Sequence, residues 1–376
     1  MIREKDLLIH LPYESFDESV VNFLYSAAND KDVLAIKQTL YRVSSSSPVV
    51  QALEKAVQNG KQVTVLMEVK ARFDEANNIL MARRLEKAGA HVIYGLVGLK
   101  THSKCTLVIR REKDGIRRYV HVATGNYNAS TAKLYTDLGI LTCNDRFGID
   151  ASAFFNLLSG YSDPPIWDSF IVAPINLRQR CIELIDREIH FAKNGEDAHM
   201  IAKMNSLLDK GIIEKLYEAS QAGVKIELIV RGICVLIPGI PGVSDNITVR
   251  SIVGRFLEHS RIFWFRNGGR EELYISSADW MPRNLNDRVE LMVPIEDPEI
   301  KRRLKQMVDI ELSDNQKAHI MQADGTWLKT ISAENQLCAQ EYFQKIAEKR
   351  DAEDEMTLAQ KLEPYTPVLG HGDGSD

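Results

Sequence analysis

Two short histidine triplets are the residues of this chain whose types and spacing favour covalent chemistry. His102-Ser103-Lys104 and His259-Ser260-Arg261 each place a cation two positions after a histidine. On a strand, residues i and i+2 point to the same face, so each cation is expected beside its histidine. A neutral imidazole, with an ordinary pKa of about 6.5, offers a nitrogen lone pair to phosphorus, and a neighbouring cation neutralises phosphate oxygens. The triplets therefore favour phosphoryl transfer.

The repetition of the triplet favours chemistry over simple packing. A single H-x-K sequence is more typical of a half-buried strand histidine with a solvated basic neighbour. Here each copy is followed by an apolar strand and then by an asparagine, Asn126 at 24 residues from His102 (126 − 102) and Asn284 at 25 residues from His259 (284 − 259). Each asparagine could orient a histidine or donate to phosphate, and a turn residue is an equally good interpretation. The matched spacing predicts two homologous halves.

The elements predicted around these motifs alternate helices with short β-branched strands, which is the pattern of an α/β fold. In the first half, helices at 33–43, 49–58 and 76–87 alternate with strands at 62–69, 91–94, 105–110 and 118–123. A helix at 212–221 and a strand at 224–230 repeat the plan. The Ser-Asp-Pro-Pro stretch at 162–165 is expected to join domains 1–169 and 170–350. Residues 351–376, charged and then rich in Gly and Asp, are predicted to be a disordered tail.

Composition and charge restrict the classes of function. The chain has 376 residues, 44% hydrophobic and 26% charged, as expected for a soluble globular protein of two or three domains. A net charge of −5 does not favour generic binding to nucleic acid, although it allows a local cationic pocket. The five cysteines are scattered without a CxxC pair, which indicates a reducing compartment and no structural zinc. No membrane span or signal peptide is visible, so a cytoplasmic location is expected.

The two H-x-K/R triplets with their downstream asparagines resemble the phospholipase D superfamily, whose fold pairs two such domains so that two histidines face one phosphate. The sequence departs from the hydrolase pattern, because Arg261 replaces the second lysine and CTLVIRRE lacks the acidic residue expected soon after Lys104. A longer series of strings resembles polyphosphate kinase of the first type, in chain order over about residues 6–330: DVLAIKQTLYRV, EVKARFDEANNI, GLKTHSKCTLVIRRE, VHVATGNYN, YTDLGILT, LIVRGIC, LEHSRIF and SSADWMPRNLNDRVE.

That resemblance implies an α/β fold of two tandem phospholipase D-like domains, each a mixed sheet flanked by helices, which share one active-site cleft. It corresponds to the C-terminal catalytic half of the family, so the family's N-terminal and head domains are expected to be missing, as in a fragment or truncated product. His102 in KTHSK matches the phosphorylated histidine, and His259 in LEHSR matches the second active-site histidine.

The remaining site residues are also assigned through the resemblance. The positions that match ATP contacts are Tyr135, Arg231 and His259. The expected phosphate or polyphosphate contacts are Lys104, Arg288, Asn126, Asn284 and Arg261. Arg42 and Arg72 match positions that the family associates with magnesium. Because a guanidinium has no lone pair to donate, we expect both arginines to bind phosphate oxygens with the metal close by.

The residues themselves support these roles unequally. Arg231 and Arg72 each follow a predicted strand at its carboxyl end, where α/β sheets place ligands, although a surface salt bridge is an equally good interpretation of Arg231. Arg42 lies in the helix predicted at 33–43, where a solvated position is the default. Tyr135 alone would be interpreted as a core residue. His121 alternates with valines and is interpreted as a packed strand residue.

The function implied by the resemblance is reversible transfer of the ATP γ-phosphate to the end of a polyphosphate chain, through a phosphohistidine and with Mg²⁺ as cofactor. The implied partners are ATP or ADP and inorganic polyphosphate, with a homo-oligomeric full-length enzyme and no nucleic acid. Peripheral association with the inner face of the membrane is compatible with this interpretation. Two alternatives stay open: a phospholipase D-like phosphodiester hydrolase, and a non-catalytic polyanion-binding fragment.

Overall fold

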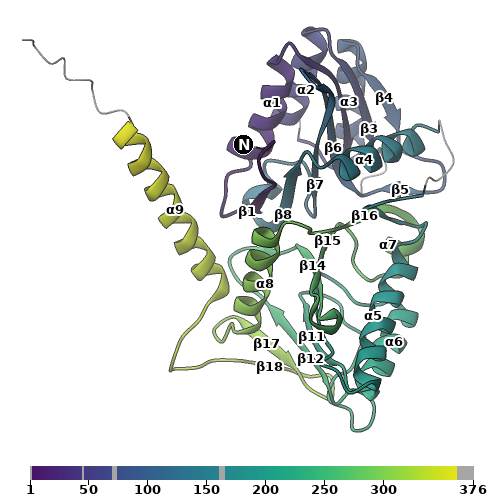
Figure 1. Cartoon of the computed structure of the whole chain (residues 1–376), viewed down its shortest axis with the longest axis vertical. Coiled ribbons are helices and arrows are strands. Elements are labelled where there is room, and N and C mark those ends of the chain that lie inside the picture. The colour runs from purple at the N-terminus through teal and green to yellow at the C-terminus, as the bar shows by residue number, and fades with distance from the viewer. Residues whose placement is uncertain (1, 45, 70–73, 161–165, 362–376) are drawn as a thin grey trace, which may run out of the picture.

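Two sheets with repeated topology form the body of the protein. The structure is a computed structural model that describes residues 2–44, 46–69, 74–160 and 166–361, with side chains described up to residue 350 (Figure 1). The first sheet has the strand order β1-β8-β7-β6-β2-β3-β4. The second sheet, followed from β9, has the order β9-β16-β15-β14-β10-β11-β12-β17-β18. The first seven strands of the two orders correspond one to one, which confirms the repeat inferred from the triplets.

The first half alternates strands with helices along the chain. In the sheet, β2, β3 and β4 pair in parallel, whereas β6, β7, β8 and β1 pair antiparallel. Its elements are β1 (Leu7–Leu11), α1 (Asn22–Asn29), β2 (Val33–Leu40), α2 (Pro48–Gln58), β3 (Gln62–Met67), α3 (Glu75–Ala88), β4 (His91–Tyr94), β5 (Lys100–Thr101), β6 (Lys104–Glu112), β7 (Gly115–Ala123), β8 (Tyr135–Thr142) and α4 (Asp145–Leu158), with short helical turns η1 (Asp17–Val21) and η2 (Thr131–Lys133).

The second half follows the same plan. Its elements are β9 (Ile171–Ala173), α5 (Leu177–Lys193), β10 (His199–Met204), α6 (Lys210–Gln221), β11 (Lys225–Val230), β12 (Ile247–Ile252), β13 (Leu257–Glu258), β14 (Arg261–Phe265), η3 (Asn267–Gly269), β15 (Glu272–Ser276), α7 (Pro282–Asn286), β16 (Arg288–Pro294), α8 (Pro298–Leu312), β17 (Ala318–Met321), β18 (Trp327–Lys329) and α9 (Ala339–Lys361).

Among the described residues, three large apolar clusters hold the layers together, and a small fourth cluster contains Ile229, Ile252 and Ala318. One packs α1, α2 and α3 on the first sheet, and a second packs α5 and α6 on the second sheet. The third is continuous across both sheets and includes α4 and α8, with Phe154 and Leu304 fully buried within it. The two halves therefore share a core, and burial of this apolar surface opposes their separation.

Two very short strands cross between the halves, and both come directly before a histidine of the triplets. Strand β5 of the first half pairs in parallel with β16 of the second half. Strand β13 of the second half pairs in parallel with β8 of the first half. The exchange is reciprocal. In each half, the segment that precedes the triplet joins the sheet of the opposite half.

The helix predicted at 33–43 is wrong, because residues Val33–Leu40 form β2 between β3 and β6. The apolar residues Val33, Ile36 and Leu40 also fit a helical spacing, which is why the pattern was ambiguous. A central strand is covered on both faces, so it lacks the strict alternation of a half-exposed strand. Arg42 consequently lies just beyond the carboxyl end of a strand, as Arg231 does.

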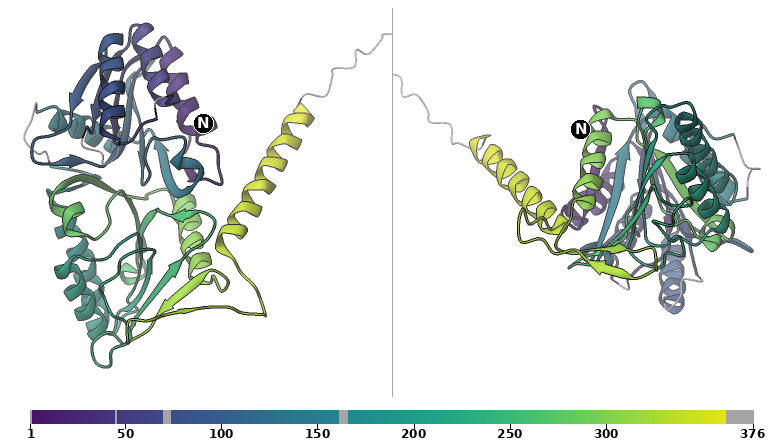
Figure 2. Two further views of the ribbon diagram at one scale, coloured as in Figure 1. Left: turned by 180° about the vertical axis from the view of Figure 1, so that it is seen from behind. Right: turned by 90° about the horizontal axis from the view of Figure 1, so that it is seen from below.

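The other predicted elements of the first half are present with end shifts of a few residues. Helix α9 extends through Lys361 and projects from the second half, so residue 351, the predicted start of the tail, falls inside this helix (Figure 2). The predicted linker at 162–165 and residues 362–376 lie outside the described residues. None of the helices that the structure describes is both long and apolar enough to cross a membrane.

Candidate active site

His102 lies at the junction of the two sheets, directly after β5. Its Nδ1 is 2.8 and 2.9 Å from the two carboxylate oxygens of Glu290, and its backbone N–H donates to the carbonyl oxygen of Val289 at 2.9 Å. The buried Glu290 also accepts hydrogen bonds from Ser277 Oγ at 2.5 Å and Asn284 Nδ2 at 2.7 Å. Within the described part of the chain, Nε2 of His102 has no hydrogen-bond partner, so it is the nitrogen available for chemistry.

His259 has the same setting with the halves exchanged. Its Nδ1 is 2.9 Å from each carboxylate oxygen of Asp137, and its backbone N–H donates to the carbonyl oxygen of Thr136 at 3.2 Å. Asp137 accepts a further hydrogen bond from Thr124 Oγ1 at 2.6 Å. The ring of Tyr135 lies 5.2 Å from the His259 ring. One strand, β8, thus supplies both the carboxylate and an aromatic neighbour to a histidine of the other half.

The two orienting carboxylates were missed by sequence reasoning, which noted only that CTLVIRRE lacks the acidic residue that the hydrolase pattern places soon after the lysine. Each half instead supplies the carboxylate for the histidine of the opposite half. Asp137 and Glu290 are the third residues of the equivalent strands β8 and β16. This shared position, in YTDLG and RVELM, is the signal that could have revealed them.

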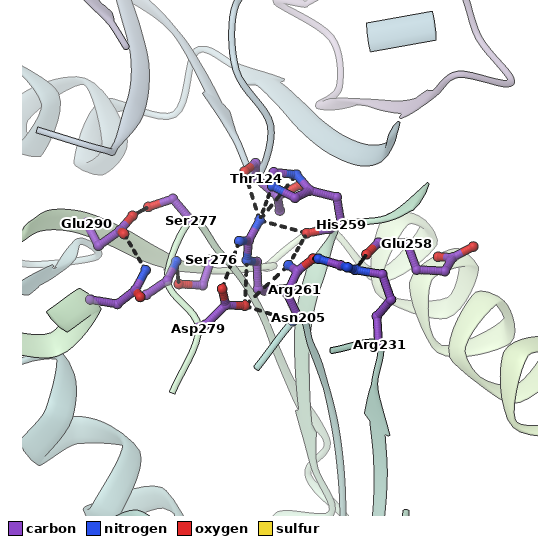
Figure 3. Close-up of polar contacts among 12 residues, drawn as sticks. Thr124, Asn205, Arg231, Glu258, His259, Arg261, Ser276, Ser277, Asp279 and Glu290 are labelled. Carbon is purple, nitrogen blue, oxygen red and sulfur yellow. Dashed lines mark hydrogen bonds and ion pairs between the residues drawn. The ribbon is translucent and has the colours of Figure 1, made fainter. Parts of the chain in front are cut away.

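Arg261 is buried and connects several groups at the centre of the site (Figure 3). Its Nε and Nη2 each donate to a carboxylate oxygen of Asp279 at 3.1 Å. Its Nη1 donates to the carbonyl oxygens of His259 at 2.7 Å and Thr124 at 3.5 Å. The same Nη1 is 3.3 and 3.2 Å from the two ring nitrogens of His259, which places it over the ring face. The planar fork expected to bind phosphate is therefore occupied by Asp279.

Arg231 is anchored to the backbone around His259. Its Nε and Nη2 donate to Asn205 Oδ1 at 3.2 and 2.9 Å, and Nε also donates to the carbonyl oxygen of Glu258 at 3.1 Å (Figure 3). Asn205 Nδ2 in turn donates to the carbonyl oxygen of His259 at 3.1 Å. The strand-end position predicted for Arg231 places its side chain beside the second histidine.

Lys104 is a buried cation of a different kind. Its ammonium donates to the carbonyl oxygen of His102 and lies 5.8 Å from the ring centroid of Tyr41. The Tyr41 ring meets the His102 ring edge-on at 4.8 Å. Burial lowers the pKa of Lys104 to about 7; Glu290 opposes this shift, and Arg261 adds to it. In the described structure no carboxylate forms an ion pair with Lys104, whereas Arg261 has a bidentate one.

The repeat differs at one position that changes the balance of charge. Thr124 and Ser277 each follow an equivalent strand, β7 or β15, and each donates to the carboxylate of its own half. Two residues further along lie Asn126 and Asp279. The structural counterpart of Asn126 is therefore Asp279, whereas the spacing from the histidines had suggested Asn284. In the second half a carboxylate balances the arginine, whereas in the first half a neutral amide occupies the position.

The pKa of His102 lies well below its ordinary value because the ring is buried and because Lys104, Arg288 and Arg261 repel a proton. His102 is thus a neutral imidazole at pH 7, whose Nδ1–H donates to Glu290. Burial also lowers the pKa of His259, although Asp137 opposes the shift. Because the charge of His259 also acts on His102, the two rings lie within electrostatic reach of each other.

The other expected site residues lie near Glu290, beside Tyr41, or outside the described residues. Arg288 Nη1 lies 3.8 Å from Glu290 Oε1, and Asn284 is already bonded to the same carboxylate. Arg42 Nε forms an ion pair with Asp74 at 2.7 Å, and its guanidinium carbon is 6.0 Å from the Tyr41 ring centroid. Arg72 lies outside the described residues. His121 is buried, as predicted.

The described side chains include no group of three or more His, Cys, Asp or Glu residues that could hold a metal ion. Two surface cavities, of about 350 and 590 Å³, lie elsewhere, one between β1, α8 and α9 and the other around Arg146 and Arg180.

Comparison with protein families identifies the chain. The model described as polyphosphate kinase C-terminal domain 1 matches residues 1–164, and the model described as polyphosphate kinase C-terminal domain 2 matches residues 170–340. The chain belongs to the polyphosphate kinase family. This confirms the resemblance stated from the sequence, and the matched regions are the family's two C-terminal domains.

Curated polyphosphate kinases are similar over most of this chain. The relative from Halalkalibacterium halodurans is 60% identical over 317 residues, which are 84% of this chain and 45% of the relative. The relative from Synechocystis sp. is 55% identical over 352 residues, which are 93% of this chain and 48% of the relative. The chain thus spans about half the length of the curated relatives it matches.

Solved structures agree with the fold. The crystal structure of polyphosphate kinase from Porphyromonas gingivalis matches with a TM-score of 0.87 and 40% identity, covering 94% of this chain and 54% of that one. Phosphatidylserine synthase from Haemophilus influenzae matches with a TM-score of 0.56 at 12% identity, covering 96% and 95%, and shows similarity of fold alone. The expected α/β fold of two tandem domains, each a mixed sheet flanked by helices, is confirmed.

We predict that Glu290→Gln disturbs His102, although the two residues lie in different halves. Glu290 accepts from three donors, and a glutamine has one acceptor oxygen and an NH₂ group, so at least one donor would face the NH₂. The expected loss is about 1–3 kcal/mol in the free energy of unfolding, measured by urea denaturation, together with a shifted Nδ1–H signal of His102 in NMR spectra.

The matched control is Glu227→Gln, because Glu227 accepts from His199 Nε2 at 2.7 Å away from the site. This control should leave the His102 and His259 ring signals unchanged. An unshifted His102 signal in Glu290→Gln would contradict the cross-half pairing.

Proposed function

We propose that this chain carries the phosphoryl-transfer centre of a polyphosphate kinase, with His102 as the nucleophile. The observation that carries the proposal is the geometry of His102. Its Nδ1 is engaged by Glu290 at 2.8 Å, its Nε2 has no partner among the described residues, and the buried Lys104 lies beside it. This leaves one lone pair available for attack next to a positive charge that suits a phosphate.

In the proposed reaction, Nε2 of His102 attacks the γ-phosphorus of ATP in line, the bond to the bridging oxygen breaks, and ADP leaves. The ring then carries both the phosphoryl group on Nε2 and the proton on Nδ1, so it is cationic and the Glu290 carboxylate stabilises it. The phosphoryl group next passes to a terminal oxygen of polyphosphate, and the reverse sequence forms ATP. Catalysis by positioning and charge neutralisation is the usual pattern for phosphoryl transfer.

The asymmetry of charge supports His102 over His259 as the acceptor. Arg261 lies over the His259 ring and is balanced by Asp279, whereas Lys104 has no carboxylate of its own among the described residues. An incoming anion would therefore gain more on the His102 side. His259 is proposed to stabilise the transferring group or to act as general acid or base, with Tyr135 and Arg231 as nucleotide contacts.

The remaining cations are proposed as phosphate contacts. Arg42 and Arg288 lie around Tyr41 and Glu290, and Arg72 is included from the resemblance alone. Mg²⁺ is the proposed cofactor, and it neutralises phosphate charge when bound. The described donor groups do not form a protein cage for it, and this fits an ion carried mainly by the phosphates of the nucleotide, as is common for Mg²⁺.

A phosphodiester hydrolase is the second candidate, because the fold and the paired histidines would also serve that reaction. The two candidates differ in the acceptor, which is polyphosphate in one and water in the other. Release of ADP with growth of a phosphate polymer supports the kinase, and cleavage of a phosphodiester without a nucleotide requirement supports the hydrolase.

We predict that labelled ATP with magnesium gives an acid-labile, base-stable phosphoenzyme whose label maps to the peptide containing His102. The assay is made on this chain and on a full-length relative with equivalent substitutions. His102→Ala should abolish the label, and Glu290→Gln should slow labelling about 10²-fold, the scale for loss of a preorganised stabilising group.

The matched control is His199→Ala, which removes another carboxylate-paired histidine of the second half and should label normally. Label confined to the peptide with His259 would overturn the assignment of the nucleophile. Label on neither histidine in the full-length relative would contradict the phosphohistidine mechanism.

We also predict that binding of tripolyphosphate takes up a proton at Lys104. The pKa of the free Lys104 is about 7, so at pH 8 the group is largely neutral. An anion stabilises the charged form and raises this pKa, so up to about one proton is taken up at pH 8, and uptake declines as the pH falls below 7. Calorimetry in buffers of different ionisation enthalpy measures the uptake. Lys104→Arg stays charged and should bind without uptake, and equal uptake in that variant would contradict the assignment.

A further inference from the structure

The segment that leads into His259 pairs with a strand on one side, and the side chain of Gln340 bonds to it on the other. Strand β13 pairs with β8 through only two residues, Leu257 and Glu258. On its other side lies Gln340, a residue of the first turn of α9. Gln340 is 4% exposed. Two residues of strand pairing give little intrinsic stability, so the second contact matters for the position of this segment.

The amide of Gln340 bonds to this segment as a neighbouring strand would. Its Oε1 accepts from the backbone N–H of Phe256 at 3.0 Å, and its Nε2 donates to the carbonyl oxygen of Phe256 at 2.9 Å. The second Nε2 hydrogen goes to Glu258 Oε1 at 2.6 Å. Gly254 leaves the necessary room, since a Cβ there would lie 2.4 Å from Gln340 Oε1. Both amide hydrogens are thus used, and the side chain has one defined orientation.

Glu258 transmits this contact toward the site. Its other oxygen, Oε2, accepts from Lys203 Nζ at 2.6 Å and from Thr136 Oγ1 at 2.8 Å. Burial raises the pKa of Glu258, but Lys203 together with the hydrogen bonds from Gln340 and Thr136 brings the pKa below its ordinary value, so the group is a buried carboxylate. Among the described residues, Gln340 is the only partner of Oε1. Removing it would leave a buried charged oxygen unsatisfied.

The backbone of Glu258 is also connected to Arg231 and to His259. The carbonyl oxygen of Glu258 accepts from Arg231 Nε at 3.1 Å, and the next residue is His259. The first turn of α9 is itself fixed, because the backbone N–H of Ala339 donates to Asp314 Oδ2 at 2.8 Å and Phe343 lies in the shared core. Gln340 is therefore held rigidly, and it reaches Arg231 and His259 through one intervening residue, Glu258.

We propose that Gln340 is a positioning residue, which holds the segment 256–258 so that the His259 ring meets Asp137 and the Arg231 guanidinium faces the site. Its importance for phosphoryl transfer rests on the proposed function, whereas its effect on the His259 ring does not. The strand before His102, β5, pairs with β16 and is held by another side chain, because Glu68 Oε2 accepts from the backbone N–H of Thr101 at 2.9 Å, so its position does not depend on Gln340. The proposal therefore predicts a selective effect on one of two otherwise similar histidines.

The test is NMR observation of the Nδ1-bound ring protons of His102 and His259 in this chain, assigned with His102→Ala and His259→Ala. In Gln340→Ala, the His259 proton should exchange with water about tenfold faster, as expected from loss of one hydrogen bond. The His102 proton should be unchanged and serves as the internal control. Gln344→Ala is the matched control, since Gln344 lies one turn along α9 and bonds only to Glu348 in the described structure, at 3.1 Å.

If Gln340→Ala does not fold, Gln340→Met keeps the length of the side chain without its hydrogen bonds and is measured in the same way. An unchanged His259 proton in a folded variant would overturn the proposal. So would equal acceleration at both histidines, because that would indicate general loosening of the protein. Loss of phosphoenzyme formation with an unchanged His259 ring proton would likewise overturn positioning. The ring measurement needs no turnover, so a failure of the proposed function would not be mistaken for a failure of this inference.

Discussion

The reciprocal exchange of short strands between the two halves is the constraint on which the site depends. The backbone N–H of His102 binds the carbonyl oxygen of Val289, and that of His259 binds the carbonyl oxygen of Thr136. In each case the next residue of the partner strand is the carboxylate that binds the histidine ring. One backbone hydrogen bond therefore fixes the position of each histidine along the partner strand and brings its ring to the carboxylate of that strand. Neither histidine can be oriented by its own half alone.

The exchange yields a symmetrical frame, and a small number of residues then make it asymmetric. Arg261 and Asp279 form an ion pair. The corresponding residues of the first half are Lys104 and the neutral Asn126, and burial lowers the pKa of Lys104 to about 7. Buried Lys203 shows the contrast, since Glu258 and Glu311 outweigh its burial and raise its pKa. A buried cation without its own counter-ion is costly in the free protein, and an incoming phosphate relieves that cost.

Much of the fold and part of the site could be predicted from the sequence. The repeated triplet led to two homologous halves, and the strand orders agree with it. The element at 33–43 was predicted as a helix because a strand covered on both faces lacks strict alternation. Asp137 and Glu290 were missed because the exchange between halves has no local signature, and Gln340 was missed because its partners lie more than 80 residues away.

The most direct test of this account is native-state hydrogen exchange at the backbone N–H groups of His102 and His259. Both are bonded across the junction of the halves, at 2.9 and 3.2 Å. The account predicts that both exchange only through an opening that separates the two sheets, so that they show the same free energy of opening and the same denaturant dependence. Exchange of the His102 amide at a much lower free energy, while the His259 amide stays protected, would contradict a single site built jointly by both halves.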